Sequence, residues 1–436
     1  MSSKSIITNG NLLGSFGRLA AGSTFGYVLA LLVSPIITRI YSPEEFGRFA
    51  VFGSIVAIFS IVATLSFEFG ILGSLRRPLA LRFSLAATWS ASLMLFFGLL
   101  TSLFLSFFGL VDLLLSPSEI VLAFVSCFIA VVTNISINSA IHVNESSIAA
   151  RGTFFNLSMR SLLQVGFGYL FGGLSSLIYG DVVGRLIGWM AVERGSFRAA
   201  LMGFFSYRKI IWKHIKSNAS YVFFLTPANA IETALVWLLA PLFTIFYDPI
   251  IGGIVAMVQR LASAPLTIIN QSLGQVFHHY ASRVYEKDSI LIIRNTLLIT
   301  FFTMPLLVGM MLIFWFYGEK ISIIIFGDQW GSAGYVMFIF LPLYYVYFLS
   351  LITNRLLMIM SRTYIKLIAS IFHLILLLGV LPFANWLGLD WVGGMMMLAS
   401  CLTCSHLLVF IIVLLLIRSY PHPGSFGLDK FFSKRI

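Results

Sequence analysis

Charged residues are scarce in this sequence. Asp, Glu, Lys and Arg make up 10% of the 436 residues, whereas hydrophobic residues make up 59% and the mean hydropathy is +0.97. Soluble domains contain about 25% charged and about 45–50% apolar residues. This composition excludes an ordinary soluble fold and predicts an all-α integral membrane protein that crosses the bilayer many times.

Cysteine is also rare, and the familiar catalytic motifs are missing. Cys127, Cys401 and Cys404 lie in apolar runs without a His or Asp cluster, so we expect buried thiols rather than a metal or redox site. The sequence has no GxxxxGK(S/T) phosphate loop, no HExxH and no visible nucleophile–His–acid set. We therefore expect no enzymatic activity, no cofactor and no metal, and any energy input to come from gradients.

Apolar windows of about 20 residues predict twelve membrane helices. They fall near 14–38, 46–72, 83–108, 118–142, 153–173, 175–192, 219–246, 250–276, 291–316, 332–357, 365–386 and 391–417. The N-terminal apolar stretch is read as the first span, not as a removed signal. With both termini in the cytoplasm, 21 of the 28 Lys and Arg residues fall on the cytoplasmic side. The net charge of +12 therefore reflects topology, and nucleic acid is not an expected partner.

Two segments of the chain repeat at a constant offset. "SPIITRIYSPEEFG" (34–47) and "APLFTIFYDPIIGG" (240–253) share Pro, Thr, Tyr, Pro and Gly at five matching positions. Prolines recur as helix terminators, but five identities at one spacing favour an internal duplication. Six spans per repeat give both copies the same orientation, which is typical of parallel repeats. We predict six-helix lobes at 1–194 and 218–417, a basic cytoplasmic linker at 195–217 and a cytoplasmic tail at 418–436.

The linker contains a short amphipathic segment, "FFSYRKIIWKHIK" (204–216). Its apolar side chains alternate with a Lys/Arg face at helical spacing. The segment is interpreted either as a helix lying on the anionic inner leaflet or as an ordinary positive-inside linker.

Polar residues form stripes along several predicted spans. The eighth span contains Arg260, Ser263, Thr267, Gln271 and Gln275 on one face, and the fifth contains Asn156, Arg160 and Gln164. Lipid cannot satisfy these groups, so such stripes predict a polar interior.

Some of these buried polar residues have structural explanations. Asp181 and Arg185 are spaced as a helical ion pair, and Arg160 and Arg355 could snorkel to an interface instead of lining a pathway. Arg260 and Glu232 have no opposite charge in their own helix, so they either line the pathway or pair with each other. Gly180, Gly184 and Gly188 predict a seam for close helix packing.

Three segments carry a resemblance to a known family. "LLVSPIITRIYSPEEFGRFAVFGSIVAIFSIVATLSFEFGIL" (31–72), "GGIVAMVQRLASAPLTIINQSLGQVFHHYAS" (252–282) and "FGDQWGSAGYVMFIFLPL" (326–343) resemble the polysaccharide biosynthesis flippases. These form the O-antigen (Wzx-type) branch of the multidrug/oligosaccharidyl-lipid/polysaccharide exporter superfamily. The resemblance implies two six-helix lobes around a central cationic cavity that opens alternately to each side of the bacterial inner membrane. The implied cargo is an undecaprenyl-pyrophosphate-linked oligosaccharide moved to the periplasmic leaflet, with membrane lipids and polysaccharide polymerase machinery as partners.

The chemistry of that cargo assigns roles to the polar residues. Pyrophosphate suits the planar donor fork of arginine, and sugars suit amides and hydroxyls. The predicted substrate-binding residues are Arg39, Arg160, Arg260, Gln271, Gln275 and Arg355. Glu68 and Glu232 are the predicted ion-coupling residues. Alternatives are a cation-coupled multidrug or other lipid exporter of the same superfamily and, less favoured, a membrane polymerase or ligase, for which the short outer loops leave no catalytic domain.

Overall fold

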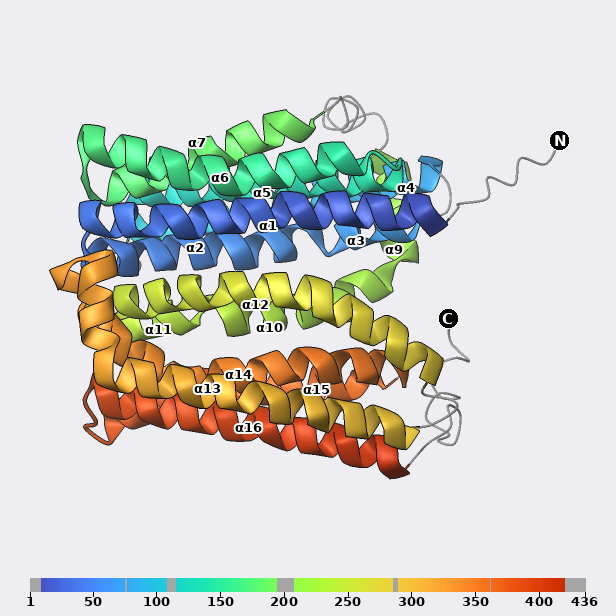
Figure 1. Cartoon of the computed structure of the whole chain (residues 1–436). Coiled ribbons are helices and arrows are strands. Elements are labelled where there is room, and N and C mark those ends of the chain that lie inside the picture. The colour runs from blue at the N-terminus through green and yellow to red at the C-terminus, as the bar shows by residue number, and fades with distance from the viewer. Residues whose placement is uncertain are drawn as a thin grey trace. The chain divides into compact units, whose positions relative to one another are not determined.

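The computed structural model describes residues 9–74, 77–107, 115–193, 208–284, 289–360 and 362–419. Within these ranges all regular structure is helical (Figure 1). The first half of the chain forms α1 (Asn9–Ile40), α2 (Pro43–Thr64), α3 (Phe67–Gly73), α4 (Arg77–Phe107), α5 (Pro117–His142), α6 (Ser146–Phe171), α7 (Gly173–Val192) and α9 (Arg208–Ser217). The second half forms η1 (Tyr221–Leu225), α10 (Thr226–Trp237), α11 (Leu239–Phe246), α12 (Pro249–Val284), α13 (Ser289–Phe326), η2 (Asp328–Trp330), α14 (Ala333–Ile359), α15 (Thr363–Trp386) and α16 (Trp391–Ser419).

Each predicted span coincides with one helix or with consecutive helices. In the described ranges, eight helices are long and apolar enough to cross a membrane, and a ninth span results if the bent pair 221–237 and 239–246 counts as one. The chain is therefore a multi-pass membrane protein. α6 and α7 do not pass this length and hydropathy test, and their seam of glycines and buried charges explains the lower hydropathy.

Two predicted spans are interrupted. The second breaks between α2 and α3, where Leu65 and Ser66 take the left-handed conformation, with φ of 51° and 56°. Residues other than glycine are strained when the backbone angle φ is positive, so surrounding contacts must stabilise this break. The seventh span bends by 58° between Trp237 and Leu239. The prediction of continuous helices at these two places was wrong.

Helix starts follow local sequence rules. "SPEE" at 42–45 and "SPSE" at 116–119 form the same capping box. In each, the serine hydroxyl accepts a hydrogen bond from the backbone N–H of the glutamate three residues later, and the glutamate carboxylate accepts one from the backbone N–H of the serine. Proline follows each serine at the first helical position, where its missing N–H carries no cost.

The chain divides into two compact units. Unit 1 contains 1–257 and 323–330, and unit 2 contains 258–322 and 331–436. Apolar side chains of α2, α3, α4 and α5 form the core of unit 1, including Phe52, Phe67, Phe83 and Phe124. The predicted lobe boundaries at 1–194 and 218–417 remain a prediction.

The repeated segments fold alike inside unit 1. α1 ends at Ile40 and α2 begins at Pro43, while α11 ends at Phe246 and α12 begins at Pro249. A β-carbon on Gly47 would overlap the carbonyl oxygen of Pro249, and one on Gly253 would overlap that of Pro43. This exchange of equivalent contacts is what a local two-fold relation produces, and it supports the duplication inferred from the sequence.

A segment from late in the sequence belongs to unit 1. The Trp330 side chain is fully buried, its Nε1–H donates to the Thr38 carbonyl at 2.8 Å, and its ring packs edge-on against Phe46. The Gln329 amide donates to the carbonyls of Thr38 and Tyr41 at 2.9 and 3.1 Å. These bonds satisfy orphan carbonyls at the end of α1.

α9 uses its apolar face for protein contacts. Ile211 and Ile215 are buried in the unit 1 core, and His214 packs against Phe83 at 4.5 Å between ring centroids. Burial, together with the nearby Arg82 guanidinium, lowers the pKa of His214. The isoleucine face is therefore not available to lipid. Trp212 remains half-exposed, with the Lys216 ammonium 5.4 Å from its ring centre. Residues 195–207 of the predicted linker lie outside the described ranges.

The reciprocal glycine contacts predict that alanine at Gly47 or Gly253 lowers the stability of the folded protein, whereas alanine at Gly166 does not. Gly47→Ala or Gly253→Ala forces two helix backbones apart and should destabilise the folded protein by about 1–3 kcal/mol, as overpacking does. Gly166→Ala is the matched control, because its β-carbon would meet no atom within 4 Å and helical Gly→Ala changes gain about 0.5–1 kcal/mol. Thermal unfolding in detergent measures both. Equal unfolding temperatures for the three variants would contradict close packing at this crossing.

Candidate functional site

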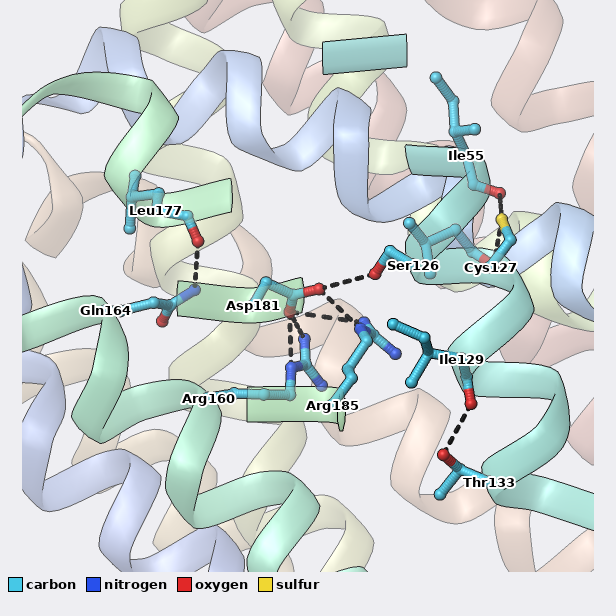
Figure 2. Close-up of polar contacts among 11 residues, drawn as sticks. Ile55, Ser126, Cys127, Ile129, Thr133, Arg160, Gln164, Leu177, Asp181 and Arg185 are labelled. Carbon is cyan, nitrogen blue, oxygen red and sulfur yellow. Dashed lines mark hydrogen bonds and ion pairs between the residues drawn. The ribbon is translucent and has the colours of Figure 1, made fainter. Parts of the chain in front are cut away.

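The strongest concentration of buried charge described in unit 1 lies between α5, α6 and α7 (Figure 2). Asp181 on α7 is completely buried and receives two guanidinium groups. Arg160 Nη2 lies 2.5 Å from its Oδ1, and Arg185 Nε lies 2.6 Å from its Oδ2. The Ser126 hydroxyl on α5 donates to Oδ2 at 3.1 Å. One carboxylate therefore links three helices.

Glycines bring these groups within reach. A β-carbon on Gly180, Gly184 or Gly188 would collide with the backbone of Gln164, Arg160 or Asn156, respectively. This confirms the predicted small-residue seam and places α6 and α7 in close antiparallel contact. Gly172 and Gly173, with φ of 66° and 75°, form the tight turn between the two helices.

The predicted Asp181–Arg185 pair is confirmed, but sequence reasoning missed the third member. Residues equally far from the Gly172–Gly173 turn face each other, so Arg160 lies opposite Gly184, one turn from Asp181. The position of the turn and the spacing of the glycines together define which residues of α6 and α7 face each other. This is the sequence signal from which the pairing of Arg160 with Asp181 could have been predicted.

The cluster retains a positive charge. Two guanidinium groups share one carboxylate, so Arg160, Asp181 and Arg185 together carry a net charge of +1. Desolvation of such groups costs several kcal/mol per ion, and shared hydrogen bonds offset it. The Arg160 side chain is 24% exposed and that of Arg185 12%, so one edge of the cluster reaches the surface of unit 1. Such an edge attracts anions.

A second buried acid lies beside the break between α2 and α3. Glu68 is 6% exposed, and its Oε2 has no hydrogen-bond partner among the described residues. The Asn138 amide donates to the Glu68 carbonyl at 3.1 Å, and the Asn229 amide donates to the Ser66 hydroxyl at 3.2 Å. α5 and α10 thus hold the left-handed break, and the free carboxylate oxygen makes Glu68 a candidate for ion binding.

The other predicted site residues are dispersed. Arg39 is exposed near the end of α1 and donates to the Ile324 carbonyl at 3.1 Å. Arg260 on α12 is partly buried in unit 2, and its carbonyl accepts from Ser263 at 3.1 Å. Glu232 on α10 is partly buried in unit 1. The side chains of Gln271, Gln275 and Arg355 lie outside the described residues. An Arg260–Glu232 pair remains a prediction.

The cysteines match the sequence expectation only in part. Cys127 is buried, with its Sγ 3.6 Å from the Val56 carbonyl oxygen, whereas Cys404 is exposed on α16. The prediction that all three thiols are buried was wrong, because Cys404 lies on an outward face of its helix. In the described ranges, no group of three or more His, Cys, Asp and Glu side chains comes together.

Comparison with known proteins gives a structural likeness and no sequence match. No family model matches the sequence, and no curated protein matches it. An inward-facing multidrug resistance MATE family transporter of the MOP superfamily has a TM-score of 0.67 at 12% identity, over 90% of this chain and 94% of that one. The lipid II flippase MurJ, in an inward closed conformation, has a TM-score of 0.64 at 13% identity, over 95% and 89%.

These likenesses concern the fold. The all-α, twelve-span, two-lobe layout predicted from the sequence fits both structures. Identities of 12–13% support no transfer of substrate or mechanism.

Removing the shared carboxylate should destabilise unit 1. Asp181→Asn leaves two neighbouring guanidinium groups without a counter-charge, and breaking a buried pair in this way costs about 3–5 kcal/mol. We expect a lower unfolding temperature and lower yield of the purified protein. Asp181→Asn combined with Arg185→Gln restores the net charge of the cluster and should recover part of the loss. If the single variant is as stable as the parent, Asp181 does not hold the helices together.

Proposed function

We propose that this protein flips undecaprenyl-pyrophosphate-linked oligosaccharides from the cytoplasmic to the periplasmic leaflet by alternating access, for assembly of O-antigen or a related surface polysaccharide. The observation that carries the proposal is the presence of arginine deep inside predicted spans. Arg160, Arg185 and Arg260 lie at least seven residues from either end of a predicted span, and no Lys does. Arg355 lies two residues from the end of its span, and Lys366 is the second residue of the span 365–386. The fold shared with known transporters supports the general activity.

Arginine within the membrane suits a pyrophosphate cargo. A polyprenyl tail can stay in lipid while the anionic headgroup and sugars need a polar path. The guanidinium fork binds phosphate oxygens in pairs and is weakly hydrated, which makes it better suited than Lys to this task. In unit 1 the net charge of +1 at the Asp181 cluster provides attraction, and Arg160, Arg260, Arg355 and Arg39 are the proposed contacts. Gln271 and Gln275 are proposed to bind the sugars.

The direction of transport fits the membrane potential. Moving an anion outward across a membrane that is negative inside is favoured by about 2.3 kcal/mol per charge per 100 mV. Uniport of the substrate is therefore physically possible. Coupling to protons or another cation would add to this force, and Glu68 and Glu232 are the proposed coupling residues. The buried, partly unsatisfied carboxylate of Glu68 favours it as the first to test.

A cation-coupled multidrug or other lipid exporter is the second proposal. Its support is the fold alone, since the MATE transporter and the lipid II flippase are similar to this chain to nearly the same degree, with TM-scores of 0.67 and 0.64. A cavity for cationic drugs should be acidic or apolar, and the arginines of this chain oppose that. A membrane polymerase or ligase is less favoured, and we propose no enzymatic activity. The proposed location is the bacterial inner membrane with both termini in the cytoplasm, and polysaccharide polymerase machinery is the proposed partner.

Arg260 is the most direct test of anion transport. Arg260→Ala should abolish surface O-antigen ladders, because a charge-assisted contact contributes about 1.5–3 kcal/mol, roughly a 10- to 150-fold change. Arg260→Lys should retain part of the activity because the charge remains. Arg418→Ala, an exposed change in the last turn of α16, is the control. Normal ladders from the alanine variant at normal protein levels would rule out a substrate role.

The null strain tests the substrate class. Deleting the gene should remove one surface polysaccharide and cause lipid-linked repeat units to accumulate on the cytoplasmic side. Loss of drug resistance with intact surface glycans would instead favour the multidrug exporter.

Glu68→Gln tests coupling. The amide preserves shape but cannot exchange a proton, so flipping of a lipid-linked oligosaccharide in proteoliposomes should lose its response to an imposed pH gradient while gradient-independent flipping continues. Glu44→Gln, an exposed change in the first turn of α2, is the control and should respond as the parent does. If Glu68→Gln responds to the pH gradient as the parent does, Glu68 is not the coupling residue. The same measurement on Glu232→Gln would then test the remaining acid.

A further inference from the structure

α9 has an exposed face that the proposed function does not use. On its other face, Ile211, His214 and Ile215 are buried against unit 1, which fixes the rotation of the helix about its axis. Successive residues of a helix are about 100° apart, so the lysines fall on the side turned away from the protein. Lys209, Lys213 and Lys216 are all exposed there.

The first turns of α4 lie beside this helix. The Trp212 ring packs edge-on against Trp89 of α4, with 6.1 Å between the centroids, and the His214 ring packs in the same way against Phe83. Arg82, the exposed neighbour of Phe83, lies close to His214. Two helices therefore bring four exposed cations to one region of unit 1, and we call Arg82, Lys209, Lys213 and Lys216 the basic patch.

Neither helix contains a carboxylate that could neutralise the basic patch. The sequence has no Asp or Glu between Glu68 and Asp112, a stretch that contains all of α4, and none between Glu193 and Glu232, which contains all of α9. The buried arginines of α6 and α7, by contrast, share the carboxylate of Asp181. Like charges gathered on a surface without a counter-charge attract an anion from outside.

An apolar stripe runs along α4 from the basic patch. Trp89 follows Arg82 by seven residues, and Phe96, Leu100 and Phe104 continue on the same face at helical spacing. The last three side chains are 57%, 48% and 63% exposed. They belong to a candidate membrane span, so the stripe faces acyl chains. A cationic end followed by an apolar length matches the build of a phospholipid.

α9 itself also carries exposed apolar side chains. Trp212 and Ile210 flank the lysines and are 51% and 49% exposed. The Lys216 ammonium lies 5.4 Å from the centre of the Trp212 ring. Tryptophan is enriched at membrane–water interfaces, where lysine lays its stem on apolar surface and extends its ammonium to the headgroups. Inorganic phosphate or nucleic acid would cover the ammonium groups and leave these apolar side chains in water, whereas a lipid covers both.

We propose that α9 and the first half of α4 form a binding site for an anionic phospholipid of the surrounding bilayer. The basic patch binds the headgroup, and an acyl chain lies along Trp89 and the stripe that follows it. A zwitterionic phospholipid binds more weakly because its headgroup carries no net charge. The proposal is independent of the cargo, because it concerns a lipid bound to the outer surface of unit 1.

Native mass spectrometry of the full chain in detergent tests the site. Phosphatidylglycerol and phosphatidylcholine with identical acyl chains are titrated separately, and the affinity for the first bound copy is measured. We expect the parent to bind phosphatidylglycerol more tightly. Combining Lys209→Gln, Lys213→Gln and Lys216→Gln should weaken phosphatidylglycerol binding about 10- to 100-fold, as the loss of three lysines near an anionic headgroup predicts, and leave phosphatidylcholine binding unchanged.

A second triple variant separates the site from net charge. Arg294→Gln, Lys320→Gln and Arg418→Gln together remove the same charge from exposed positions on α13 and α16. This variant should bind phosphatidylglycerol as the parent does. Equal losses in the two triple variants, or equal affinity of the parent for the two phospholipids, would overturn the proposal.

Competition identifies the source of the anion. Glycerol phosphate has the charge without the chains, so at equal concentration it should not displace phosphatidylglycerol from the parent. Its success would reduce the site to an anion-binding surface and overturn the lipid assignment. Preferential displacement by undecaprenyl phosphate would assign the patch to the proposed cargo instead, and would equally overturn the choice of a bilayer phospholipid. Absence of oligosaccharide flipping by the parent would count against the proposed function and leave these lipid titrations unaffected.

Discussion

A carboxylate shared by two guanidinium groups is the interaction on which unit 1 depends. Asp181 is fully buried and joins α5, α6 and α7 through Ser126, Arg160 and Arg185 (Figure 2). Such a cluster is expensive to desolvate, and its replacement by apolar side chains would often be neutral or stabilising. Its retention in a hydrophobic chain therefore points to specificity or function. We propose that the excess of one positive charge serves to attract an anionic headgroup.

Close backbone approach makes this arrangement possible. Gly180, Gly184 and Gly188 let α7 lie directly against α6, so that long arginine side chains reach a carboxylate that has no freedom to move. Gly47 and Gly253 likewise allow two helix backbones to approach closely where the two repeats meet. In a bilayer, where apolar contacts between helices gain little over contacts with lipid, small residues and polar bonds determine which helices associate.

The two units differ in the kind of polar chemistry that they bury. Unit 1 contains ionised groups in fixed pairs and one carboxylate with an unsatisfied oxygen, Glu68. In α14, α15 and α16 of unit 2 there is no acid, and the described polar centre is a stack of two imidazoles. Unit 1 therefore buries fixed charges, whereas these helices of unit 2 bury aromatic rings with no acid beside them in sequence.

The sequence by itself determined the number and position of the spans, the repeat at Gly47 and Gly253, and the glycine seam of α7. These are local features, governed by hydrophobic length, backbone conformation and residue size, so they can be read along the chain. Only the tertiary structure decided that Arg160 joins Asp181, that Leu65 and Ser66 break the second span, that Ile211 and Ile215 pack inward, and that His373 meets His406. Each of these depends on which faces of distant helices come together, because in lipid a polar group is satisfied by whichever partner the packing brings within hydrogen-bonding distance.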